Sequence, residues 1–346
     1  MKIGSYLIVA GLLLITLLGA CNKVQPGTSG QNSQMVVLAE ITAGDSAVIP
    51  LSVSAPIGNN QTISFQKLTT AAVAITDPSG NSNSLQWNNS PDFSNNPATV
   101  YTGPGIFKAD QSYSLRVSQP GLGTMSATTH IPQAFSVQNV TTSDGSRNGV
   151  DVMNFTFTMA DNPLEKNYYI FEAVKQLVVV HHYFFWQGVK YDYDSPDGQL
   201  VYQQASSQQN IDILKDTTRT PSYLRLNVFT NDPNTDNKDF GSLDSSFHRI
   251  FLTDSLFNGS TYTTTFSIDK TYFESSTPQD KGIVLIQVKS VSKELYDYLS
   301  MYERYRVDFG ILPPNNLTSP TGNIQNGLGV FGGSYRNEWL FYYDEL

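Results

Sequence analysis

The sequence predicts an all-β protein. Only 15% of its 346 residues are charged, and Tyr and Phe number 19 each, a composition that suits strands bearing aromatic, hydroxyl and amide side chains. Short runs of alternating or β-branched residues recur between Gly, Pro, Asp and Asn, as expected for strands joined by turns. A formal net charge of −9 without a basic cluster argues against nucleic-acid binding, because phosphates would be repelled.

The first 21 residues combine a positive charge at Lys2, an apolar run over Tyr6–Leu18 and the sequence Leu18-Gly19-Ala20-Cys21. The run is too short to remain a membrane-spanning helix, and small residues precede a cleavage site. Cys21 is the only cysteine, so it has no partner for an internal disulfide. An unpaired thiol is one interpretation; the one we favour is a bacterial lipoprotein signal with Cys21 as the lipidated first residue of the mature protein.

Residues 22–34 are rich in Gly, Ser, Thr, Asn and Gln, which predicts a flexible tether between lipid and body. Asn22, rather than Asp, follows Cys21. In a Gram-negative lipoprotein this residue predicts delivery to the outer membrane, and it leaves open which face of that membrane carries the body.

Seven short strands are expected between residues 35 and 132. They are Met35–Thr42, Ala47–Val53, Ala71–Thr76, Ser84–Trp87, Thr99–Thr102, Tyr113–Ser118 and Thr124–Ile131. Their number and spacing are typical of an immunoglobulin-like or transthyretin-like β-sandwich. The cysteine pair of antibody domains is missing, so only the architecture is predicted.

A larger β-rich domain is expected over residues 133–346, because a body of about 310 residues exceeds the usual size of one domain. Its expected strands are Val152–Met159, Tyr168–Val180, His181–Trp186, Tyr223–Thr230, Tyr262–Ile268 and Gly282–Val291. Thr141–Gly149 is expected to be a polar loop. The Gly-rich run 322–333 is expected to be a loop leading to a final extended segment.

One helix is predicted near residues 292–305. Ser292 can cap it, Leu295, Leu299 and Tyr302 fall on one face, and neither Gly nor Pro interrupts it. Its tyrosines suit packing on a sheet, with an aromatic binding face as the alternative.

The segment 232–239 offers a possible calcium site. Asp232, Asn234, Asp236 and Asp239 place oxygen ligands on a turning loop, and calcium takes six to eight oxygens. The pattern lacks the glycine and the final glutamate of a calcium-binding loop. An acidic turn without metal is the alternative.

Aromatic residues suggest a second kind of site, since exposed rings stack on sugars. Trp87, Trp186, Tyr191 and Tyr193 are the candidates. The acidic loop 191–198 is otherwise expected to be the turn of a long hairpin. His181 and His182 are neighbours in a strand, so their side chains should point to opposite faces and not share a zinc ion.

No catalytic motif stands out. The sequence has no Gly-x-Ser-x-Gly, His-Glu-x-x-His, Walker or dinucleotide-binding motif. The single cysteine is assigned to lipidation and is therefore not expected to act as a nucleophile. Together with the missing motifs, this means that we do not expect an enzyme.

Several segments resemble one family of Bacteroidota lipoproteins, known as domain of unknown function 4249. They are the signal ending in Cys21, the opening 36–41, the block 254–262, the pair Tyr168-Tyr169 after Asn167, the helix at 292–305, and the ending 323–332. Leu38-Ala39 departs from the Glu-Gly expected in the opening strand. The resemblance implies an envelope protein found beside TonB-dependent outer-membrane receptors, and it supplies no catalytic residue.

Three functions are consistent with these features. The first is a non-catalytic accessory or binding component of a TonB-dependent receptor or another envelope complex, with an outer-membrane β-barrel as partner. The second is a surface glycan-binding or adhesion lipoprotein, and the third is a spacer without a ligand. No cofactor is expected, apart from possible calcium.

Overall fold

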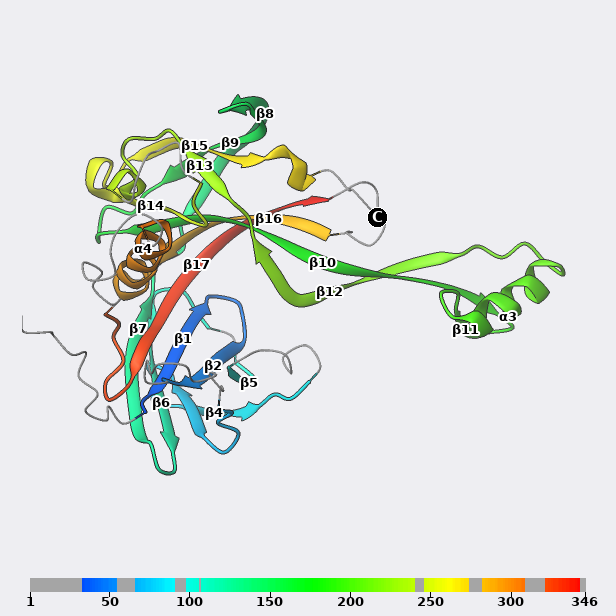
Figure 1. Cartoon of the computed structure of the whole chain (residues 1–346), viewed down its shortest axis with the longest axis horizontal. Helices are drawn as coiled ribbons and strands as arrows, with labels where there is room; N and C mark the ends of the chain where they lie inside the picture. The colour runs from blue at the N-terminus through cyan, green and yellow to red at the C-terminus, as the bar shows by residue number, and fades with distance from the viewer. Residues whose placement is uncertain are drawn as a thin grey trace, which may run out of the picture. The chain divides into compact units, whose positions relative to one another are not determined.

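The computed structural model describes residues 33–54, 66–90, 98–105, 107–239, 246–273, 282–308 and 321–342. Within these residues the structure has one sheet of 13 strands, a second sheet of four strands and two α-helices (Figure 1). The predicted all-β class is therefore confirmed. The signal peptide with Cys21, and the tether up to residue 32, lie outside the described residues.

All seven strands predicted between residues 35 and 132 are present. They are β1 Met35–Thr42, β2 Ala47–Val53, β3 Ala72–Thr76, β4 Ser82–Trp87, β5 Thr99–Gly103, β6 Gln111–Gln119 and β7 Gly123–Ile131. In β1, Met35, Val37, Ala39 and Ile41 are buried while Leu38 is exposed, the alternation of a strand with one face on a core.

The remaining elements are β8 Ser136–Arg147, β9 Val150–Ala160, β10 Tyr168–Trp186, β11 Val189–Asp192, α3 Pro196–Ser206, β12 Leu214–Arg225, β13 Val228–Thr230, β14 Ile250–Thr253, β15 Thr261–Asp269, β16 Gly282–Val291, α4 Lys293–Asp308 and β17 Leu328–Tyr342. Three short 3₁₀ helices cover Asp236–Asp239, Asp254–Leu256 and Lys270–Phe273. The small sheet has the order β13-β15-β9-β8.

The second half of the C-terminal glycine-rich run belongs to a strand, where the sequence suggested a loop: β17 begins at Leu328 and continues into the final extended segment that the sequence predicted. From residue 328 to 334, β17 pairs in parallel with β1, and from 334 to 342 it pairs antiparallel with β16. A Cβ at Gly329 would overlap the carbonyl oxygen of Val37, and one at Gly333 would overlap that of His130. The glycines are therefore required by close approach of other backbones, which the local sequence does not reveal.

Strand β17 also contributes to two cores. Phe331 packs with the buried residues of β1–β7, whereas its neighbour Val330 packs with those of the larger region. Side chains of adjacent strand residues point to opposite faces, so one strand serves both cores. The domain division at Pro132 stays a prediction, with β17 as the element common to both sides.

Strand β8 occupies most of the segment expected to be a polar loop. It pairs with β9, and the two are joined at Asn148 and Gly149, whose φ angles are 50° and 80°. Two positive φ angles are typical of a tight hairpin turn, with Asn-Gly as its preferred sequence. Because β8 is an edge strand with mostly exposed side chains, its polar sequence resembled a loop.

Helix α4 confirms the helix predicted at 292–305. Leu295 and Tyr296 are buried, and the Tyr296 ring contacts those of Tyr168 and Phe251. Tyr302, expected on the packed face, is instead exposed. Core packing of the helix is therefore found at its first two turns.

Substitutions in β9 can test which of its side chains point into the larger core. Phe155 is fully buried and stacks on Phe266, with ring centroids 5.5 Å apart. We expect Phe155→Ala to lower the free energy of unfolding by about 3–5 kcal/mol, because it leaves a cavity. Thr156→Ala removes only a hydroxyl contact with Thr265 and should lower it by about 1 kcal/mol. Chemical denaturation measures both, and equal losses would contradict the assigned faces.

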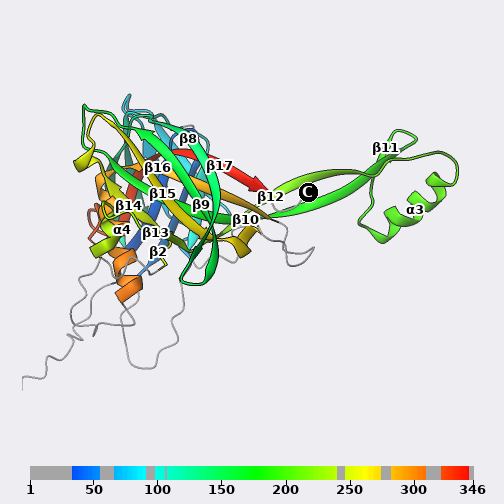
Figure 2. The same ribbon diagram turned by 90° about the horizontal axis from the view of Figure 1, so that it is seen from above.

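Strand β10 is a single strand of 19 residues, where two were expected. Its pairing with β12 runs from Val174–Arg225 to Tyr183–Leu214. Figures 1 and 2 both show these strands side by side, ending at β11 and α3. The loop 191–198, expected to be a hairpin turn, instead contains the end of β11 and the start of α3. The Ser195 hydroxyl accepts a hydrogen bond from the Gly198 amide at 3.0 Å and caps that helix.

Candidate functional site

The four candidate calcium ligands lie between β13 and β14, and protein donors already occupy the acidic oxygens of Asp232. Its Oδ2 accepts hydrogen bonds from Tyr262 at 2.6 Å and Thr264 at 2.7 Å. Its Oδ1 accepts one from the Asn234 amide at 2.9 Å. The Asn234 side chain in turn donates to the Tyr262 oxygen at 2.9 Å.

The other two candidate ligands face α4. Asp236 accepts a hydrogen bond from Tyr296 at 2.6 Å, and the carbonyl of Asp239 accepts one from Arg304 at 3.2 Å. Asn237 stands where a calcium loop has glycine; it donates to the Arg249 carbonyl at 2.8 Å and is fully buried. Among the described residues, no three His, Cys, Asp or Glu side chains come together at a possible metal site.

Three tyrosine–aspartate pairs link separate elements in this region. Besides Tyr262–Asp232 and Tyr296–Asp236, Tyr169 donates to Asp161 at 2.5 Å. Burial, together with the hydrogen bond to Asp232, raises the pKa of Tyr262 to about 12. A phenol with a raised pKa contributes stability that is complete below its unfolded pKa of about 10 and is lost as the pH rises through about 12.

The geometry predicts how the loop responds to calcium. We expect equal melting temperatures in EDTA and in millimolar calcium, because the Asp232 oxygens already have protein donors. Asp232→Ala should lower the free energy of unfolding by about 1–3 kcal/mol, since it leaves two hydroxyls without their acceptor. A calcium-dependent rise in melting temperature that Asp236→Ala removes would instead support the calcium hypothesis.

A cluster of charges is buried where β10, β16 and β12 meet. Glu172 on β10 is 3% exposed and forms ion pairs with Lys289, with Arg249 at 3.1 Å and with Arg225 at 3.3 Å. Lys289 also pairs with Glu40 of β1 at 3.1 Å. Each charge has an oppositely charged partner, so the cluster joins strands that are distant in sequence.

The neighbouring charges also determine the protonation state of Glu172. Burial raises its pKa, but Lys289, Arg249 and Arg225 together lower the pKa of the carboxyl well below its usual range. The pKa of Glu40 is lowered in the same way, with burial opposed by Lys289. Both carboxyls are therefore ionised and held by cations, which is the arrangement of a structural cluster.

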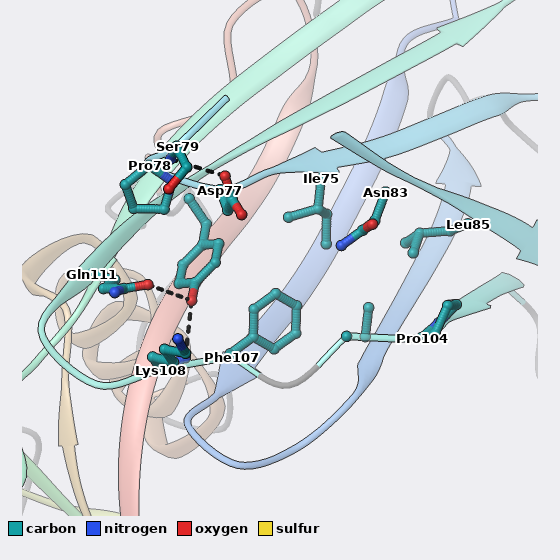
Figure 3. A pocket seen from close by; sticks show the side chains of 13 residues that line it. Ile75, Asp77, Pro78, Ser79, Asn83, Leu85, Pro104, Phe107, Lys108 and Gln111 are labelled. Atoms are coloured by element: carbon teal, nitrogen blue, oxygen red, sulfur yellow. Dashed lines mark hydrogen bonds between the residues drawn. The ribbon is translucent and has the colours of Figure 1, made fainter. Parts of the chain in front are cut away.

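A small cavity lies in the β1–β7 region (Figure 3), with a volume of about 200 Å³. Ile75, Leu85 and Phe107 form its apolar wall. The Asp77 carboxylate beside them accepts hydrogen bonds from its own turn, including the Ser79 amide at 2.9 Å. Ligand pockets usually measure about 300–1,000 Å³, so this cavity is small and its acidic group is already engaged.

Three of the four candidate stacking residues come together at the end of the β10–β12 pair, which we name the hairpin tip (residues 181–216). Trp186, Tyr191 and Tyr193 pack around buried Phe184. The Tyr191 ring stacks on Phe184, with centroids 5.4 Å apart. Trp87 lies separately on β4 and is 45% exposed.

A helix covers the aromatic side of the hairpin tip. Tyr202 and Ala205 of α3 pack on Phe184. Phe185 and Leu214, on strands beside it, are exposed. Phe185 and Leu214 were not selected from the sequence. The signal that could have indicated this cluster was the aromatic run 183–186, followed by Ser195-Pro196, which is a typical start of a helix.

A family model described as a domain of unknown function, DUF4249, matches residues 22–338. The chain belongs to this family. Among curated proteins, none matches the chain.

The segments that carried the DUF4249 resemblance have structural roles. Strand β1 contains the opening 36–41 and pairs with the glycine-rich ending in β17. In the block 254–262, Asp254 accepts a hydrogen bond from the Asn167 amide at 2.7 Å, and the Gly259 amide donates to Asp161 at 2.8 Å. These contacts fix the loops around β10.

No helix in the described part of this DUF4249 chain has the length and apolar character needed to cross a membrane. Helix α4, the longest of them, has 16 residues.

Proposed function

We propose that the protein is a lipid-anchored outer-membrane protein of the Bacteroidota that acts as a non-catalytic binding component of an envelope complex, with a TonB-dependent receptor as the favoured partner. The signal that ends in Cys21, the only cysteine of the chain, carries this proposal. A lipidated cysteine would place the body at a membrane surface, where its partners are other envelope components.

The position of the body relative to Cys21 supports the proposal. The family match begins at residue 22, directly after Cys21, and β1 begins at Met35. If these residues form the flexible tether that the sequence predicts, a segment of that length would have a root-mean-square span of about 20 Å. The body would therefore stay close to the membrane and within reach of proteins embedded in it.

The use of the polar residues supports a binding role over catalysis. The carboxyls of Glu172, which is buried, and Glu40, which is half-buried, are held in ion pairs with Lys289 within a sheet. The family segments position strands and loops. These features make a stable β scaffold that presents surfaces to a partner.

Glycan binding is the second candidate, and Trp87 is the observation that favours it. The residue is 45% exposed on β4, and stacking on a sugar requires an exposed aromatic side chain. Trp186, Tyr191 and Tyr193 are engaged in the packing of the hairpin tip. Binding to bacterial and host polysaccharides that is lost in Trp87→Ala would favour this candidate.

Affinity purification tests the first candidate. The full-length, tagged protein is purified from detergent-solubilised outer membranes, and co-purifying proteins are identified by mass spectrometry. We expect an outer-membrane β-barrel protein in stoichiometric amounts. Purification of the protein alone, after chemical cross-linking in intact cells, would contradict the proposal.

A further inference from the structure

One face of the hairpin tip has no covering element among the described residues. At Tyr183, β10 pairs with Asp192 of β11 on one side and with Leu214 of β12 on the other. Side chains of paired residues lie on the same face, and they alternate along a strand. Tyr183, Phe185 and Leu214 therefore share the face opposite to Phe184, which α3 covers.

This face, which we name the open face (Tyr183, Phe185, Lys190, Leu214 and Asp216), is apolar at its centre. Phe185 is 52% exposed and Leu214 is 42% exposed. The rings of Tyr183 and Phe185 contact each other edge to face, with centroids 5.7 Å apart. Exposed aromatic and aliphatic side chains that adjoin one another on a rigid sheet mark interaction surfaces.

A single ion pair frames the open face. The Lys190 ammonium lies 3.7 Å from the centre of the Tyr183 ring and 3.2 Å from the Asp216 carboxylate. These contacts hold Tyr183 and the lysine in place beside Phe185. Phe185 is therefore bordered by one cation and one carboxylate, each about half exposed.

The hairpin tip has a core of its own. Phe184, Ala205 and Ile211 are buried within residues 184–211. Between Val178 and His182, the described pairing of β10 is with β12. Two strands alone are marginally stable in water. The small core therefore stabilises the tip. A simple turn would not need such a core, which indicates that the tip has a function of its own.

Charge identifies the kind of partner. Residues 181–216 contain five aspartates and two lysines, a net charge of −3. The five are Asp192, Asp194, Asp197, Asp212 and Asp216. Lys190 is already paired with Asp216. Like charge disfavours an anionic lipid surface and a second copy of the tip, whereas it attracts a basic protein surface.

We propose that the open face docks onto a protein of the envelope complex, at an apolar patch bordered by Lys and Arg side chains. This inference rests on the proposed function and extends it by naming the surface used and the chemistry of its partner. Phe185 and Leu214 enter the apolar patch. Asp192, which is paired with Tyr183 on the same face, and the exposed Asp212 meet its basic border.

Site-specific photo-cross-linking in cells tests the proposal. Full-length protein is made with p-benzoylphenylalanine in place of Phe185, and with the same residue in place of Leu256 as a control. Leu256 is an exposed apolar residue outside the hairpin tip, at 70% exposure. We expect one cross-linked envelope protein from position 185 and none from position 256, with the cross-link mapped beside Lys or Arg.

Two further variants measure the contribution of the face. Phe185→Ala combined with Leu214→Ala should lower recovery of that partner at least tenfold, and Asp212→Lys should lower it several-fold. Leu256→Ala should leave recovery unchanged. Each substitution is at an exposed residue, so the melting temperature should change little.

The outcomes separate this inference from the proposed function. If the wild-type protein co-purifies with an envelope protein and the double variant retains it fully, the open face is wrong and the proposed function stands. If the wild type recovers no partner, both fail. Cross-links to lipid alone, to a second copy, or equally from positions 185 and 256 would also overturn the inference.

Discussion

Glu172→Ala is expected to lower the free energy of unfolding by about 3–5 kcal/mol, because it removes the one carboxylate that Lys289, Arg249 and Arg225 share and leaves Glu40 and Glu303 as the remaining acidic partners of the two buried cations. Lys289 and Arg249 are both under 9% exposed, so water does not replace the lost carboxylate. The effect should exceed that of removing the same atoms from the surface. Urea denaturation followed by circular dichroism measures it.

A surface ion pair gives the matched control. Lys293 and Asp297 form an exposed pair one turn apart on α4, and Asp297→Ala should lower the free energy of unfolding by less than about 1 kcal/mol. Equal losses for Asp297→Ala and Glu172→Ala would contradict the structural importance of the buried cluster.

The same cluster predicts sensitivity to acid. The pKa of Glu172 is lower in the folded protein than in the unfolded chain, where it is about 4.3. The unfolded state therefore binds more protons over this range, and stability is complete above about pH 4.3 and falls as the pH decreases toward the folded pKa. Glu172→Gln should reduce this acid dependence while still destabilising the protein at pH 7.

Segments with a regular alternation of apolar and polar residues were predictable from the sequence, because that alternation reflects one face of a strand or helix packing on one core. The β1 alternation and the Ser292 start of α4 are local signals, and both elements occur where expected. The extended end of β17 was predicted, but its glycine-rich start was expected to be a loop, because its glycines make room for the backbones of Val37 and His130, which lie far away in sequence. Strand β8 was missed because an exposed edge strand has no apolar face to reveal it.

In the candidate site, too, the features close together in sequence were predictable, and the contacts between residues distant in sequence were not. The spacing of Asp232 and Asp236 suggested calcium, but the hydroxyl donors that occupy them come from Tyr262 and Tyr296, on other elements. The ion cluster did leave a readable trace. Glu172 and Lys289 are charged residues inside apolar strands, and such residues are usually buried in pairs.

The proposed lipid anchor predicts the largest change in behaviour from a single substitution. Cys21→Ser should abolish labelling with radioactive palmitate and move the protein from the outer-membrane pellet to the soluble fraction. Each acyl methylene buried in the bilayer contributes about 0.8 kcal/mol, so loss of the chains removes the main attachment. The melting temperature of the body should stay unchanged, because β1 begins only at Met35.

A carbonate wash makes this test decisive, since the body could still reach the membrane through a protein partner. Carbonate strips proteins held by protein contacts and leaves lipid-anchored ones in the pellet. Wild-type protein should therefore resist the wash, while any residual Cys21→Ser protein should be released. Ser29→Ala, a change within the same tether, should behave as the wild type. Carbonate-resistant Cys21→Ser protein would show that Cys21 is not the anchor, and would place the attachment elsewhere in the chain.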